Sequence, residues 1–140
     1  MSTNENSIAI VPCSGIGKPF GSVSREAAYE LCENLRPDYT RLVALSKLVM
    51  GDNETKKIIC QNLVITIDGC KQMCAAKMVK QSGGTIAREM TVLDTYRQHK
   101  TLKPEGIAEL NESGKQLAYE LAKEIADITD QIKPKGGYYA

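Results

Sequence analysis

The chain has 140 residues, of which 42% are hydrophobic, 25% charged and 5% aromatic, and its formal net charge is +1. This length suits about one domain, so we expect residues 1–140 to form a single domain. The near-neutral charge and the few aromatic side chains argue against nucleic-acid binding, which uses basic patches and stacking platforms. No run approaches the roughly 18 apolar residues of a membrane span, and the polar segment 1–7 has no secretion signal, which predicts a cytoplasmic protein.

The first half of the chain alternates between strand-like and helix-like segments. The apolar run Ser7–Val11 predicts a strand, and the glycine-rich segment Cys13–Gly21 predicts a loop. A helix is expected between an N-cap at Ser24 and the helix-ending Pro37, because apolar residues recur there every four positions. Leu42–Leu45 then predicts a short second strand.

The same alternation continues through the middle of the chain. A short helix is expected over Glu54–Cys60, followed by a strand over Leu63–Ile67, which is rich in β-branched residues. Lys71–Gln81 has helical propensity and ends at a pair of glycines, and Ala87–Tyr96 predicts a fourth strand.

The last third of the chain is expected to be helical. A short helix over Glu105–Leu110 follows Pro104, which suits a first helical turn, and a long amphipathic helix ends before Pro134. The complete order, βαβαβαβα, predicts an α/β fold of three layers. Its mostly parallel sheet of about four strands would carry helices on both faces.

Five cysteines are the unusual feature of the composition. Without a secretion signal, thiols or a metal site are expected in place of structural disulfides. Cys13 follows the first strand and Cys70 follows the strand Leu63–Ile67. Parallel strands bring their carboxyl ends to one edge of a sheet, where ligands bind. Since Cys74 is one helical turn beyond Cys70, the sequence predicts three cysteines at this edge.

Two interpretations remain open for these thiols. The spacing of Cys70 and Cys74 falls within that of zinc-ligating cysteines, and a helix N-terminus stabilises a thiolate. Alternatively, both side chains are small hydrophobic groups buried in a core. Cys32 lies on an apolar helix face and is expected in the core, whereas Cys60 precedes a strand and is expected at the opposite edge.

Two further features lie beside the cysteines. Asp68 ends its strand and either orients a metal ligand or caps the helix that follows. The loop after the first strand is similar to phosphate-binding loops, but it lacks the Ser or Thr that follows the lysine of a Walker A motif. Gly15, Gly17 and Lys18 are a candidate anion-binding loop, and the alternative is a plain glycine-rich turn.

Short motifs of this chain resemble those of the DGC-domain family, namely Pro12-Cys13-Ser14-Gly15-Ile16-Gly17, Ile67-Asp68-Gly69-Cys70 and Cys74-Ala75. The resemblance covers most of the chain and includes the segment 102–107. The family is described as zinc-binding because it has four cysteines that can chelate a metal. By this resemblance, Cys13, Cys70 and Cys74 are expected to hold zinc, and the fourth position falls to Cys60, water or a substrate.

The cysteines lead to two functional hypotheses. The first is a cytoplasmic zinc-binding protein whose site lies at the C-terminal edge of the sheet. The alternative is a metal-free thiol enzyme or sulfur carrier with Cys70 or Cys13 as the nucleophile. A third hypothesis is an interaction domain with inert cysteines. The expected partner is a small molecule or a protein, not a nucleic acid or a membrane, and the sequence leaves open whether the chain is an enzyme.

Overall fold

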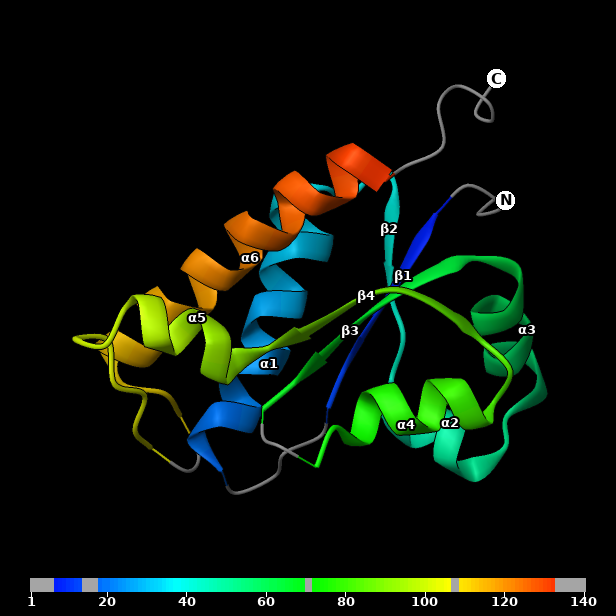
Figure 1. The fold of residues 1–140 in the computed structure, drawn as a ribbon, viewed down its shortest axis with the longest axis horizontal. Helices are drawn as coiled ribbons and strands as arrows, with labels where there is room; N and C mark the ends of the chain where they lie inside the picture. Colours follow the sequence, from blue (N-terminus) through cyan, green and yellow to red (C-terminus); the bar gives the residue numbers. More distant parts are fainter. Residues whose placement is uncertain (1–6, 14–17, 70–71, 107–108, 133–140) are drawn as a thin grey trace.

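The computed structural model describes residues 7–13, 18–69, 72–106 and 109–132. Its four strands are β1 (Ile8–Pro12), β2 (Thr40–Leu42), β3 (Leu63–Asp68) and β4 (Thr85–Thr91). They form a fully parallel sheet in the order β2-β1-β3-β4 (Figure 1). The helices are α1 (Pro19–Glu30), its π-helical continuation η1 (Leu31–Leu35), α2 (Leu45–Met50), α3 (Asn53–Gln61), α4 (Cys74–Gln81), α5 (Val92–Gln98) and α6 (Glu112–Ile132).

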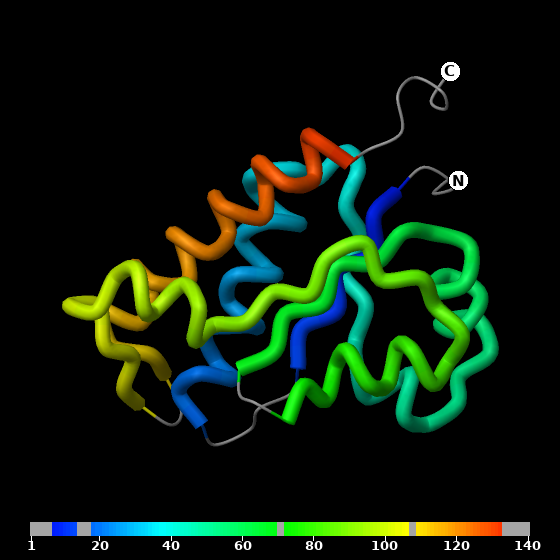
Figure 2. Tube along the Cα trace, viewed as in Figure 1, coloured from blue at the N-terminus to red at the C-terminus, as the bar shows by residue number. Residues whose placement is uncertain are grey.

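Helices cover both faces of the sheet, which confirms the predicted three-layer α/β fold. Figure 2 shows α1, α5 and α6 on one side of the strands and α2, α3 and α4 on the other. The central strands therefore alternate between two cores. Ile8 and Ile10 pack with α1 and α6, whereas Ala9 and Val11 pack with α2, α3 and α4. Burial on both faces explains why these strands are continuous apolar runs. None of the described helices is long and apolar enough to cross a membrane.

The first helix begins earlier than predicted. α1 starts at Pro19, whose fixed φ suits the first helical position, and not after a cap at Ser24. The Ser24 hydroxyl instead lies inside the helix and donates to the Gly21 carbonyl at 2.6 Å. The continuation η1 carries Cys32, which packs against the α1 and α6 core as predicted, and burial raises the pKa of its thiol to about 11.

Two predicted strands are partly wrong. The second strand is Thr40–Leu42, and Leu45 begins helix α2, which Gly51 ends with a left-handed φ of +82°. The fourth strand covers Thr85–Thr91, but the rest of the predicted segment is helix α5. The Thr91 hydroxyl caps that helix by accepting the N–H of Asp94.

The predicted helix over Glu105–Leu110 is also wrong, because none of its described residues is helical. Gly106 has a φ of +110°, outside the right-handed helical region. The Asn111 side chain accepts the N–H groups of Glu105 and Gly114, which satisfies the loop and the first turn of α6 together. The local hydrogen bonds of an N-cap residue therefore replace a short helix here.

Thr66→Val should raise the stability of the protein. Thr66 is fully buried on β3, and among the described residues its hydroxyl has no hydrogen-bond partner. Valine has a similar shape without the buried polar group, so we expect the free energy of unfolding in urea to rise by about 1–2 kcal/mol. Thr66→Ser, which keeps the hydroxyl and loses a methyl group, should lower it. A valine variant less stable than the wild type would contradict this explanation.

Candidate functional site

The candidate site lies at the carboxyl ends of β1 and β3. The chain leaves β1 toward β2 on one side and later returns past β1 to β3 on the other, so the strand order reverses between β1 and β3. In open parallel sheets the crevice at such a reversal is the usual ligand site. Cys13 follows β1 at this point, and its backbone N–H continues the ladder by donating to the Ile67 carbonyl of β3 at 2.9 Å.

The Cys13 thiol contacts polar groups from two other segments. Its Sγ accepts the backbone N–H of Gly69 at 3.3 Å, and it lies 3.3 Å from the Ser24 hydroxyl, where either atom can donate. The side chain is only 7% exposed. These contacts hold the sulfur of Cys13 between Gly69, directly after β3, and Ser24 of α1.

Asp68 holds the start of helix α4. Its two carboxylate oxygens accept the N–H groups of Ala75 and Ala76, at 2.8 and 3.1 Å. Burial raises the pKa of this carboxyl group above its usual value, and the two N–H groups act in the opposite direction. Both oxygens are engaged in capping, so of the two roles considered for Asp68 the geometry favours the helix cap.

Asp68→Ala should destabilise the protein, because it leaves two N–H groups in the first turn of α4 without this partner. We expect the free energy of unfolding to fall by about 2 kcal/mol, and Asp68→Asn, which keeps one acceptor oxygen, should have a smaller effect. Urea unfolding measures both. Asp94→Asn, on an exposed helix surface, is the control and should change stability little. Equal stabilities for Asp68→Ala and this control would contradict the capping role.

Gly69 lies against the first turn of α1. A Cβ atom at this position would be 2.9 Å from the Gly21 nitrogen and 2.9 Å from the Phe20 carbonyl carbon. Both atoms belong to the backbone and cannot rotate away. Within the Asp-Gly-Cys motif, Asp68 therefore positions the start of α4. Gly69 allows α1 to pack closely against the motif, and its N–H donates to the sulfur of Cys13.

The remaining predicted cysteines are placed as follows. Cys74 is the exposed first residue of α4, and it follows Met73, whose φ of +54° is left-handed. Cys70 lies outside the described residues. Cys60 is exposed, and its Sγ donates to the carbonyl of Ser82, just before β4. That contact places Cys60 toward the amino ends of the strands, opposite Cys13, in agreement with the sequence argument.

The described residues supply only part of a metal-ligand set. Among them, no group of three His, Cys, Asp or Glu side chains could hold a metal ion. The predicted set of Cys13, Cys70 and Cys74 includes a residue beyond that description, so this finding does not cover it. Of the candidate anion-binding loop, Gly15 and Gly17 likewise lie outside the described residues. Lys18 is exposed at the N-cap position of α1.

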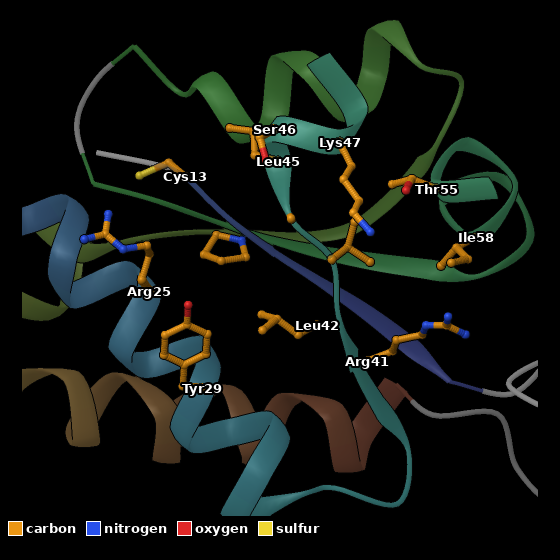
Figure 3. Close-up of a pocket in the computed structure, with 13 residues that line it drawn as sticks. Cys13, Arg25, Tyr29, Arg41, Leu42, Leu45, Ser46, Lys47, Thr55 and Ile58 are labelled. Carbon is orange, nitrogen blue, oxygen red and sulfur yellow. The ribbon is translucent and has the colours of Figure 1, made fainter. Parts of the chain in front are cut away.

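A pocket opens beside Cys13, next to the edge of the sheet formed by β2 (Figure 3). Its volume is about 620 Å³, and Pro12 and Cys13 are among its lining residues. The other walls come from α1, β2, α2 and α3. The lining residues are Pro12, Cys13, Arg25, Tyr29, Arg41, Leu42, Val43, Ala44, Leu45, Ser46, Lys47, Thr55 and Ile58. Most of this pocket could not be predicted from the sequence, because helix α2 was not expected there and the predicted strand ran to Leu45.

The DGC domain family model matches residues 9–113, which include Cys13, Cys70 and Cys74. The comparisons with curated proteins and with solved structures each gave no match.

Proposed function

Since the chain belongs to the DGC domain family, we propose that it binds a zinc ion at the carboxyl edge of β1 and β3, through the thiolates of Cys13, Cys70 and Cys74. Three protein ligands leave a fourth position for water or a substrate. When bound, such a zinc ion would supply a Lewis acid or a point of ligand exchange. The proposal includes a cytoplasmic location, where thiols stay reduced.

The observation that carries the proposal is the hydrogen bond from the Gly69 N–H to Cys13 Sγ. It joins the sulfur of one candidate ligand to the residue directly before another, Cys70. Asp68 adds the third segment, because its bonds to Ala75 and Ala76 hold the start of α4, where Cys74 is the first residue. These contacts connect the three chain segments that carry the cysteines.

Cobalt binding tests the proposal directly. Metal-free protein, titrated with Co²⁺ without oxygen, should develop the strong near-ultraviolet absorption of thiolate-to-cobalt charge transfer, and zinc should remove it by displacement. Cys60→Ser is the matched control, since Cys60 lies away from this edge and should leave the absorption unchanged. Absorption that fails to develop, or that Cys60→Ser removes, would contradict the proposed site.

A second candidate is a metal-free thiol function with Cys13 or Cys70 as the nucleophile. The observation that favours it is that Cys13 is one of the residues that line the 620 Å³ pocket, so a molecule bound there lies next to a cysteine. Iodoacetamide labelling with mass mapping separates the two functions. A metal-free protein as purified, with one thiol at this edge reacting much faster than Cys60, would favour thiol chemistry. Labelling that becomes fast only after a chelator is added would favour zinc.

A further inference from the structure

The pocket beside Cys13 has the size of a small-molecule site. Its volume of about 620 Å³ lies within the range of roughly 300–1,000 Å³ that is usual for such sites. Its lining residues come from β1, α1, β2, α2 and α3 and from the segments that join them, along the edge of the sheet formed by β2. The pocket is therefore large enough to hold a small molecule, and its lining indicates which kind.

The charges around the pocket point to an anion. Arg25, Arg41 and Lys47 line it, and no Asp or Glu is among its lining residues. In Figure 3 the Arg25 guanidinium lies toward Cys13, and the Lys47 side chain extends from α2 into the space above β2. This positive charge is local, because the chain as a whole carries a net charge of only +1.

One carboxylate has to be weighed against these cations. Asp52 lies close enough to Lys47 for their charges to interact. Hydrogen bonds from Thr55 lower the pKa of Asp52 more than the charge of Lys47 does. That carboxylate accepts both the N–H and the hydroxyl of Thr55, and Asp52 is not a lining residue. Asp52 therefore offsets part of the charge of Lys47, and the charged residues that line the pocket are all cations.

The pocket also has an apolar wall. Leu42 and Tyr29 remain 36% and 42% exposed although their side chains are large and apolar. Both line the pocket, together with the apolar side chains of Leu45 and Ile58. A ligand that covers this wall would bury apolar surface that the folded chain leaves in contact with water.

We propose that this pocket binds a small organic anion that has an apolar body. Its acidic group, a carboxylate, sulfonate or phosphate, interacts with Lys47, and its apolar body lies on Leu42 and Tyr29. The inference goes beyond zinc binding, because the cations and the apolar wall belong to α1, β2 and α2 and include no proposed zinc ligand.

A pair of fluorescent probes tests this inference. Anilinonaphthalene sulfonate has an apolar body and one negative charge, and phenylnaphthylamine is the same body without the sulfonate. Titrated into the folded protein, the sulfonate should bind saturably and more tightly than the neutral probe. Lys47→Gln should weaken sulfonate binding about threefold to tenfold and leave phenylnaphthylamine binding nearly unchanged.

Matched controls come from cations outside the pocket. Like Lys47, Arg88 on β4 and Lys57 on α3 are exposed, but they do not line the pocket, so Arg88→Gln and Lys57→Gln should not weaken sulfonate binding. Equal affinity for both probes, or equal losses in pocket and control variants, would overturn the inference. Circular dichroism confirms folding, and the zinc content of Lys47→Gln should equal that of the wild type. Probe binding and zinc content therefore test the anion pocket and the zinc site separately.

Discussion

Replacing Cys70 or Cys74 with serine should abolish tight zinc binding, whereas replacing Cys32 should leave it intact. A serine hydroxyl stays protonated near neutral pH and is a poor ligand, so each change removes one of three proposed thiolates. Loss of a residue that merely supports a ligand costs about 10- to 100-fold in metal affinity, and loss of a ligand should cost more. Competition with a chromogenic chelator, without oxygen, measures the affinity.

Cys32→Ser is the control because the structure gives Cys32 a different role. The side chain packs against the core between the sheet and helices α1 and α6, and burial raises its pKa to about 11. Its thiol interacts with Thr40 at the start of β2, and so it lies toward the amino ends of the strands, away from Cys13. If Cys32→Ser lost zinc while Cys74→Ser kept it, the proposed ligand set would be wrong.

Gly69→Ala should lower the free energy of unfolding by about 2–3 kcal/mol. The added methyl group would meet the backbone of Phe20 and Gly21 at 2.9 Å, so α1 or the end of β3 must move. Either movement also disturbs the hydrogen bond from Gly69 to Cys13, so zinc affinity should fall together with stability. Urea unfolding and chelator competition on the same preparation measure both effects.

Gly51→Ala is the informative comparison for this prediction. Gly51 has a φ of +82° but nothing within 4 Å of an added Cβ atom. Its replacement should cost only the left-handed backbone strain, about 1 kcal/mol, and should leave zinc binding unchanged. If Gly69→Ala lowered the free energy of unfolding less than Gly51→Ala does, the close approach of α1 to the motif would be contradicted.

Much of the fold could be predicted from local patterns in the sequence. The apolar strands β1 and β3 and the amphipathic helix α6 are recognisable by periodicity, and their alternation with helices implies a parallel sheet. The predictions are wrong at positions where a single side-chain hydrogen bond to the backbone decides the conformation. The Thr91 hydroxyl starts α5 within an apparent strand, and Asn111 organises a loop in place of a helix. Single capping hydrogen bonds of this kind are only weakly visible in composition.

The candidate site was predictable in outline for a topological reason. Parallel strands end at one edge, so the sequence alone could bring Cys13 near the Asp-Gly-Cys motif, and the contact between Cys13 and Gly69 agrees with this. The role of Gly69 could not be predicted, because it depends on how α1 packs across the motif. The cations of the pocket were missed for a similar reason, since Lys47 reaches it only from helix α2.

The most direct test of the account is the metal content of protein purified without oxygen, measured with a count of free thiols before and after a chelator is added. If Cys13, Cys70 and Cys74 hold zinc, the protein should contain about one zinc ion per chain, and roughly three thiols should become reactive only after the chelator removes it. Protein with no metal and with a single fast-reacting thiol would contradict zinc binding and would favour thiol chemistry at the same edge.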